Sequence, residues 1–147
     1  MGAPVEVKNR RAGFEYHVLD KYECGMVLMG SEIKSIRAGG ASLNEAFCTF
    51  IGDDLVVRNM RIAPYGTNVH FVHDPLRDRK LLLHRRELDK LKRKLKDAGM
   101  TIVPLRLFIA PNGFAKLEIA LAKGKKLFDK RASIKERDVQ REMDREG

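Results

Sequence analysis

The residue types that most often carry out catalysis do not stand in a catalytic pattern in this sequence. His73-Asp74 resembles half of a metal site, but no second His/Asp pair follows at a suitable spacing. Glu23 and Glu32 are candidates for a carboxylate pair, although nothing marks either one as a general acid. Cys24 and Cys48 lie in apolar runs without an activating neighbour, so we expect core thiols in a reducing compartment. We therefore predict no enzyme activity, no metal and no cofactor; a hydrolase that uses His73-Asp74 is the weakest alternative.

The basic residues point to another kind of chemistry, the binding of a polyanion. The sequence has 29 Lys and Arg against 20 Asp and Glu, which gives a net charge of +9 and a pI near 9.8. This excess favours nucleic acid, an anionic membrane or an acidic protein as the partner. Lysines also solubilise helices, but here basic residues recur in five clusters, and this recurrence favours nucleic acid. The clusters are residues 9–11, Lys34 with Arg37, residues 77–80, residues 85–96 and residues 123–131.

Several motifs that the sequence lacks narrow the class of partner further. No apolar run reaches the length of a membrane span, and residues 1–9 lack the apolar region of a secretory signal, so we expect a cytoplasmic protein without a membrane contact. The helix-in-groove motifs of DNA-binding proteins are missing, which favours structured RNA recognised by its shape and backbone. Tyr16, Tyr22, Tyr65 and Phe128 are candidates for stacking on bases, although such aromatics are more often core or rim residues.

The segment at residues 122–131 separates two parts of different character. Its Lys123-Gly124-Lys125-Lys126 turn offers ammonium groups and backbone N–H groups together, a combination that suits a polyanion. A solvated linker explains the same composition equally well. The choice between the two depends on the elements on either side.

The part before this segment predicts a small β-barrel. Six short runs alternate apolar and polar residues or lie between turn signals, which is typical of strands. Closing them into an OB-type antiparallel barrel removes the exposed edges, and a β-sandwich is the alternative. Pro104 indicates an edge or a bulge within its strand. The predicted strands are residues 14–20, 22–28, 46–51, 55–62, 101–109 and 114–121.

Two helices are predicted beside these strands. Residues 31–39 have helical spacing, with Ser31 as a possible N-cap and Gly39-Gly40 as the end. The second helix begins at His84, where Glu87 three residues later completes a weak capping box, and it ends before Gly99. Its apolar face is Leu88, Leu91 and Leu95, so its cations point to solvent.

The part after Arg131 has almost no residue that a core would accept. Ser133-Ile134-Lys135-Glu136 is a capping box, and opposite charges then recur at helical spacing. An isolated helix of this length is marginal in water, so we predict disorder in the free protein and a helix in a charged groove. We divide the chain into a flexible arm at residues 1–8, a barrel at residues 9–122 and a C-terminal tail at residues 123–147.

Long ordered blocks of the sequence follow the pattern of one family. They include Asn9-Arg10-Arg11-Ala12, Tyr16, Tyr22-Glu23-Cys24-Gly25, Arg37-Ala38-Gly39, Asp74-Pro75-Leu76-Arg77-Asp78-Arg79-Lys80-Leu81-Leu82-Leu83-His84, Val103-Pro104-Leu105, Ile119-Ala120-Leu121-Ala122-Lys123-Gly124-Lys125-Lys126 and Asp129-Lys130-Arg131. From about Asn9 to Arg131 the chain thus resembles the SsrA-binding protein family, SmpB. The resemblance implies an OB-type barrel that binds the tRNA-like domain of transfer-messenger RNA (tmRNA).

The resemblance also implies a place in trans-translation, the rescue of ribosomes stalled on messages without a stop codon. Proteins of this family help to deliver alanine-charged tmRNA, carried by elongation factor Tu, to such ribosomes. The barrel stands where a tRNA anticodon arm would be, in the small-subunit decoding region, and the tail enters the empty message channel as a helix. The tagged peptide then goes to proteolysis. We expect a cytoplasmic monomer without a cofactor.

The site residues implied by the resemblance fall into three groups. The RNA-facing patch corresponds to Asn9, Tyr16, Tyr22, Glu23, Leu82 and His84, beside the basic Arg10 and Arg11. Lys34 and Arg37 match a basic motif that meets phosphate. The ribosome-binding tail motif corresponds to Lys123, Gly124, Lys125, Lys126, Phe128, Asp129, Lys130 and Arg131.

The sequence departs from the family pattern at three places. Phe128 stands where Tyr or His is usual, so a polar role of that ring is in doubt. Gly13-Phe14 replaces a more basic pair, and Cys24 replaces a common Ala. A general OB-type module for single-stranded or ribosomal RNA, without a role in rescue, is the alternative function. It would bind unstructured RNA as well as the tRNA-like domain.

Overall fold

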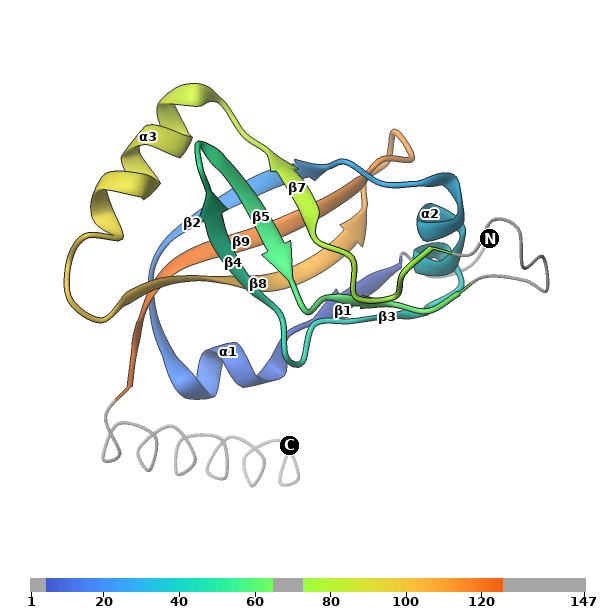
Figure 1. The fold of residues 1–147 in the computed structure, drawn as a ribbon. Coiled ribbons are helices and arrows are strands. Elements are labelled where there is room, and N and C mark those ends of the chain that lie inside the picture. Colours follow the sequence, from blue (N-terminus) through green and yellow to red (C-terminus); the bar gives the residue numbers. More distant parts are fainter. Residues whose placement is uncertain (1–4, 65–72, 126–147) are drawn as a thin grey trace, which may run out of the picture.

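Six strands close into a barrel in the computed structural model, which describes residues 5–64 and 73–125 (Figure 1). They are β2 (Tyr16–Met26), β4 (Phe47–Ile51), β5 (Asp54–Arg58), β7 (Arg79–Leu82), β8 (Met100–Ile109) and β9 (Ala115–Gly124). Antiparallel pairing runs β8-β4-β5-β7-β2-β9 and returns from β9 to β8, so the ring has no open edge. The predicted six-stranded OB-type barrel is thus confirmed, and the sandwich alternative is wrong.

The alternation along β9 shows which of its side chains enter the barrel and which lie outside it. Leu117, Ile119 and Leu121 are fully or almost fully buried and point into the barrel, where they join the main core. Ala120 and Ala122 point to the outside and are nevertheless buried. β9 is therefore covered on both faces at this end, which requires a second element outside the barrel.

That element is α1 (Arg10–Glu15), which sequence reasoning did not predict. Strands were expected at residues 14–20 and 22–28, whereas one strand, β2, begins at Tyr16 and continues to Met26, with a register shift between Val18 and Asp20. The strand β7 was not predicted. Ala12 of α1 packs on Val103, Ala120 and Ala122 in a small separate core. The small alanine side chains let the helix approach the sheet closely.

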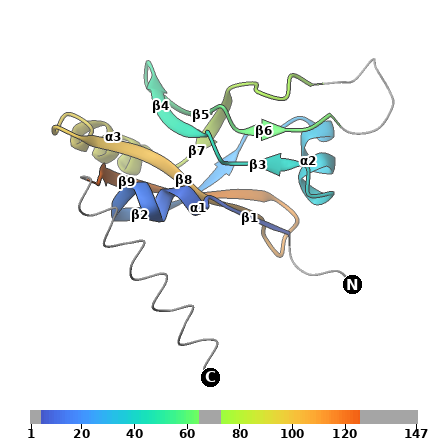
Figure 2. The same cartoon turned by 90° about the horizontal axis from the view of Figure 1, so that it is seen from below.

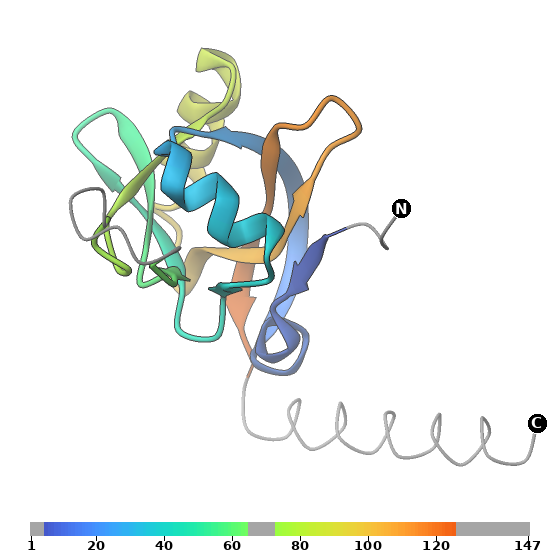
Figure 3. The same ribbon diagram turned by 90° about the vertical axis from the view of Figure 1, so that its right-hand side faces the viewer.

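Helices α2 (Gly30–Arg37) and α3 (Arg85–Lys94) close the two ends of the barrel, and both were predicted. α2 lies across one opening (Figure 3), and α3 lies at the opposite end (Figure 1). Their Ile36 and Leu91 side chains are fully buried in the core. The Glu87 carboxylate accepts a hydrogen bond from the His84 N–H at 3.2 Å, as the capping-box pattern predicts. Among the described helices, none combines the length and the apolar character that a membrane span requires.

Details at the helix ends differ from the sequence expectations in one place. The N-cap of α2 is Met29 and not Ser31, and the Met29 N–H donates to Glu32 Oε1 at 2.8 Å. The other end is as predicted: Gly39 has a φ of 81°, and the Gly40 N–H donates to the Ser35 carbonyl at 2.8 Å. Pro104 lies at a register shift of β8, which confirms the predicted bulge.

The remaining strands are short. β1 (Glu6–Lys8) pairs with β8, so this described part of the segment expected to be a loose arm is a strand. β3 (Ala41–Ser42) and β6 (Arg61–Ile62) form a separate pair beside α2 (Figure 2). β9 extends to Gly124, so the sheet continues beyond the boundary expected at residue 122.

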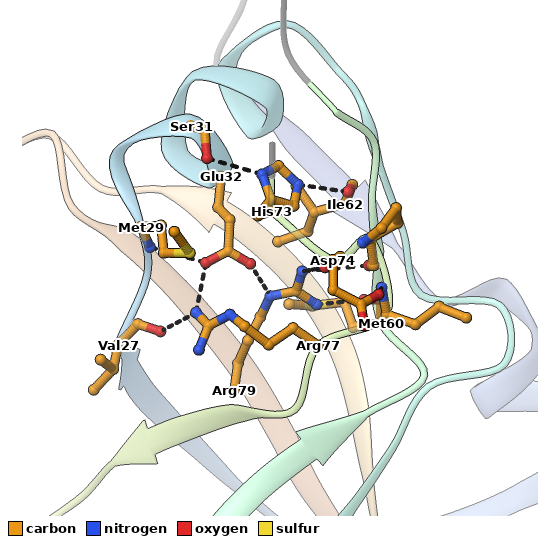
Figure 4. Close-up of polar contacts among 12 residues, drawn as sticks. Val27, Met29, Ser31, Glu32, Met60, Ile62, His73, Asp74, Arg77 and Arg79 are labelled. Atoms are coloured by element: carbon orange, nitrogen blue, oxygen red, sulfur yellow. Dashed lines mark hydrogen bonds and ion pairs between the residues drawn. The ribbon is translucent and has the colours of Figure 1, made fainter. Parts of the chain in front are cut away.

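A buried ion pair joins α2 to the barrel wall (Figure 4). Glu32 of α2 and Arg79 of β7 have no exposed side-chain surface, and Arg79 Nε donates to Glu32 Oε2. Arg77 Nη2 donates to the other carboxylate oxygen at 2.5 Å. Arg79 Nη1 also donates to the Met60 carbonyl at 2.5 Å, beyond the end of β5. The cluster thus joins four segments of the chain. Glu32 is not available as a catalytic partner of Glu23.

His73 lies beside this cluster and is also fully occupied. It is 3% exposed; its Nε2 donates to the Ile62 carbonyl at 2.8 Å, which leaves Nδ1 to accept from the Ser31 hydroxyl at 2.9 Å. Both ring nitrogens therefore have protein partners. The ring joins α2 to β6 instead of holding a metal with Asp74.

Glu32→Gln should destabilise the barrel by about 3–5 kcal/mol, because it leaves the buried Arg79 charge without its counter-ion. The exposed Glu45, which pairs with Arg11, is the control: Glu45→Gln should change stability by only about 0–1 kcal/mol. Denaturant unfolding measures both. The double variant Glu32→Met/Arg79→Met should recover much of the loss, since no buried charge remains. Equal stability of the two single variants would contradict this account.

The same pair predicts how acid acts on stability. Burial raises the pKa of Glu32, but the hydrogen bonds from Arg77, Met29 and Arg79 outweigh it, so the pKa of the folded protein lies below the ordinary value. Glu32 thus contributes stability above its unfolded pKa of about 4.3, and this contribution is lost as pH falls through the folded pKa. Unfolding of wild type and Glu32→Gln between pH 5 and pH 2 should show their stabilities converging as pH falls. A constant difference would contradict the prediction.

Candidate nucleic-acid interface

The alternation of β2 decides which of its residues reach the outside. Tyr22 and Cys24 lie opposite Ile119 and Leu117, which are fully buried, so these two point into the barrel. Glu23 therefore points outward and is exposed, as is Lys21 before it, and the partly buried Gly25 follows on the same side. Glu23 and Lys21 share the outer surface of the sheet.

β7 brings two further predicted residues to the same surface. Leu82 pairs with Gly25, where an added Cβ would meet the Leu82 Cβ at 3.3 Å, and the Leu82 side chain stays 49% exposed. Because the strands are antiparallel, moving two residues outward from this pair leads to Glu23 on one strand and to His84 on the chain after β7. We call the surface of Lys21, Glu23, Leu82 and His84 the outer-sheet face.

Tyr22 does not lie on the outer-sheet face. Its ring packs against the core, and its hydroxyl is buried without a hydrogen-bond partner among the described residues. Burial, and then the negative charge of Asp20, raises the pKa of this phenol. The structure thus separates Tyr22 from Glu23, with which the family pattern grouped it.

The predicted residues around α1 divide between two cavities. Arg10 lines a cavity of about 370 Å³ together with Lys21, and this cavity adjoins the outer-sheet face. Tyr16 and Arg11 line another cavity of about 360 Å³, where Arg11 Nη1 lies 2.6 Å from Glu45. Asn9 lines both, and it is anchored to β8.

The anchoring of Asn9 uses most of its hydrogen-bonding groups. Its backbone N–H donates to the Leu105 carbonyl and its Nδ2 to the Pro104 carbonyl, each at 2.8 Å. Its Oδ1 is buried without a partner among the described residues. Asn9 therefore positions the start of α1 against the bulge of β8, which is a structural role beside any contact with RNA.

Sequence reasoning missed several cations that the fold adds to this region. Lys8, Lys21 and Arg106 line the same cavity as Arg10, with Glu118 as the acidic member of the lining. Arg106 is the most constrained of them, because it pairs with Glu118 and Glu6 and stacks over the Phe108 ring at 4.2 Å. Lys21 was predictable, since it shares a strand face with Glu23, whereas Lys8 and Arg106 come together only through the β1–β8 pairing.

Lys34 and Arg37 lie on α2, at the end of the barrel away from α3. Both side chains are exposed, and Arg37 Nη2 donates to the Gly113 carbonyl in the β8–β9 turn at 3.3 Å. The structure thus places this basic pair at the α2 end of the barrel, opposite α3 (Figure 1).

The described part of the tail motif is bound to α1. Gly124 pairs with Tyr16, and the Lys125 N–H donates to the Glu15 carbonyl at 2.8 Å. The Lys125 Nζ donates to the Gly13 carbonyl at 3.0 Å, near the C-terminal end of α1, where a cation is favourable. Lys126, Phe128, Asp129, Lys130 and Arg131 lie outside the described residues.

Comparison with known proteins agrees with this fold. The family model described as SmpB protein matches residues 6–147. The SsrA-binding proteins of Cytophaga hutchinsonii and Bacteroides thetaiotaomicron are 54% and 55% identical over 141 residues, which is 96% of this chain and 92% and 94% of theirs. A solved structure described as "tmRNA-SmpB: a journey to the center of the bacterial ribosome" superposes with a TM-score of 0.72 at 39% identity. The match covers 88% of this chain and 94% of that one.

Lys125→Met should loosen the contact between the start of the tail and α1, because it removes the ammonium donor and keeps the aliphatic stem. We expect amide hydrogen exchange in α1 and at Lys125 to become faster, by roughly 2- to 10-fold for one lost hydrogen bond. Lys123→Met is the matched control, since Lys123 is an exposed lysine on β9, two residues before Lys125. Equal exchange in the two variants would show that the Lys125 side chain does not hold the tail.

Proposed function

The chain belongs to the SmpB protein family, and we propose on that premise that it binds the tRNA-like domain of tmRNA and delivers it to stalled ribosomes for trans-translation. The observation that carries the proposal is the outer-sheet face, which joins Glu23, Leu82 and His84 from two strands beside a basic cavity. The similar solved structure, whose description names tmRNA, SmpB and the bacterial ribosome, supports tmRNA and the ribosome as partners.

In this proposal the barrel binds tmRNA and the tail acts on the ribosome. The Glu23 carboxylate accepts hydrogen bonds from base amino groups or ribose hydroxyls, while the cations around it contact the phosphates. Leu82 offers an exposed apolar surface to a base or ribose, and Arg10 and Lys21 contact phosphates. Lys34 and Arg37 contact phosphate at the α2 end.

The tail beyond Lys125, residues 126–147, is proposed to enter the small-subunit decoding region and the message channel, because residues 123 and 124 belong to β9. There it folds as a helix, after disorder in the free protein, because its charges need a polyanionic groove as partner. Lys126, Lys130 and Arg131 would supply cations, and Phe128 would stack. Elongation factor Tu carries the charged tmRNA in the same delivery complex, to which this protein contributes as a monomer.

A non-catalytic role in the cytoplasm is part of the proposal. The residues with the chemistry for catalysis are engaged elsewhere: His73 by two hydrogen bonds and Glu32 by two arginines. Cys24 and Cys48 are free thiols and buried, and burial raises the pKa of Cys24 to about 12, which suits core residues in a reducing compartment.

Two variants test the division of labour. Glu23→Ala should weaken binding of the isolated tRNA-like domain by roughly 10- to 100-fold, as expected for the loss of charged hydrogen bonds. Truncation after Lys126 should leave this binding intact and abolish tagging of nascent peptides in a translation assay. Asp78→Ala, at another exposed carboxylate, is the control and should retain both properties. The proposal fails if truncation removes RNA binding while tagging continues.

A further inference from the structure

The six cations of α3 fall into two sets that differ in their partners. Arg85, Lys92 and Lys94 each face a carboxylate. The Arg85 guanidinium lies 3.0 Å from Asp89 and 3.8 Å from Asp53, and the Lys92 ammonium lies 3.0 Å from Asp53. These contacts fix the β4–β5 turn against one flank of the helix. Their charges are therefore largely compensated within the protein.

The other three cations, Arg86, Lys90 and Arg93, have no acidic partner within 4.0 Å among the described residues, and all three are exposed. Their spacing of four and then three residues places them on one face of the helix. This face lies opposite the core-facing side, which Leu91 and its neighbours Leu88 and Leu95 occupy. We call these three residues the α3 cation row.

The α3 cation row adjoins the outer-sheet face at the N-terminal end of the helix. α3 begins directly after His84, so Arg86 stands two residues from a member of that face. At the other end, Lys94 of α3 lies 2.8 Å from Asp20 of β2, next to Lys21. The helix thus contacts β2 at Asp20, and an RNA that lies over Glu23 and His84 reaches the row at Arg86.

We propose that Arg86, Lys90 and Arg93 contact consecutive backbone phosphates of the tRNA-like domain of tmRNA, and so extend the footprint of the outer-sheet face along α3. This inference rests on the proposed function. A helix rises about 1.5 Å per residue, so the row spans roughly 10 Å, the length of a few nucleotides of RNA backbone. Cations without an ion pair in the protein release counter-ions from RNA at full effect, whereas the paired cations first have to leave their carboxylates.

Because the row is continuous with the outer-sheet face, we assign both surfaces to the same RNA. The two surfaces meet at His84, so an RNA that contacts one can continue onto the other. Lys34 and Arg37, in contrast, lie at the other end of the barrel and do not take part in this footprint.

The salt dependence of RNA binding tests the row. The variant Arg86→Gln/Lys90→Gln/Arg93→Gln should bind the isolated tRNA-like domain roughly tenfold or more weakly at 0.1 M salt. The slope of log K against log salt should decrease in magnitude by roughly 2–3, since each lost phosphate contact removes roughly 0.7–0.9. Glutamine is a good helix former, and circular dichroism checks that α3 is retained.

The control removes the same net charge from paired positions. Arg58→Gln/Arg85→Gln/Lys92→Gln takes away three cations that face Asp78, Asp89 and Asp53, two of them on α3 itself. Its slope should stay within about 1 of wild type. The variant Arg86→Lys/Arg93→Lys should keep the wild-type slope, because the charges remain. Equal slopes for the row variant and the control would overturn the inference, since net charge alone would then explain the effect.

Failure of the inference can be told apart from failure of the proposed function. If Glu23→Ala weakens binding and the row variant behaves like the control, the tRNA-like domain binds the outer-sheet face without the row. If neither variant changes binding relative to the controls, the proposed interface itself is wrong, and the row with it.

Discussion

The buried pair of Glu32 and Arg79 is the contact on which the arrangement of this protein depends. Burying both charges is costly, and the structure compensates by giving each of them several hydrogen bonds: Glu32 accepts from Arg77 and Met29, and Arg79 donates to the carbonyls of Met60 and Pro75. The pair thereby fixes α2 and the start of β7 in one position. Because β7 carries Leu82 to its place on Gly25, the same contact also positions the outer-sheet face.

Strand β2 connects the two activities that the protein is proposed to have. Its outer surface presents Lys21 and Glu23 to RNA, and its first residue, Tyr16, pairs with Gly124 at the start of the tail. α1 lies between these regions, with Arg10 in the basic cavity and the carbonyls of Gly13 and Glu15 bound by Lys125. The tail thus leaves the barrel next to the RNA-binding side. The family resemblance assigns Lys125 to ribosome binding, but here its hydrogen bonds to Gly13 and Glu15 stabilise the fold.

Local patterns predicted most of the fold, and long-range contacts account for what they missed. Alternation predicted β4, β5, β8 and β9, but it divided β2 into two strands and did not predict β7. The bulge at Pro104 and the start of α3 followed from backbone chemistry that neighbouring residues determine. α1 did not, because Ala12 is buried only against Ala120 and Ala122, far along the chain. Likewise, Glu32 and Arg79 are 47 residues apart, and no local pattern reveals their pairing. The inward position of Tyr22 was predictable, since alternation puts Tyr22 on the same face as Cys24.

The central claim is that the outer-sheet face recognises a folded RNA by its shape, and competition binding tests it most directly. Labelled tRNA-like domain bound to the full-length protein is displaced either by the same unlabelled domain or by an unstructured RNA of equal length, at one salt concentration. We predict that the unstructured RNA needs roughly a hundredfold higher concentration or more, because only the folded domain matches the shape of the outer-sheet face. Phosphate contacts alone would not distinguish the two RNAs. Equal displacement by both RNAs would contradict the account and indicate a general RNA-binding module.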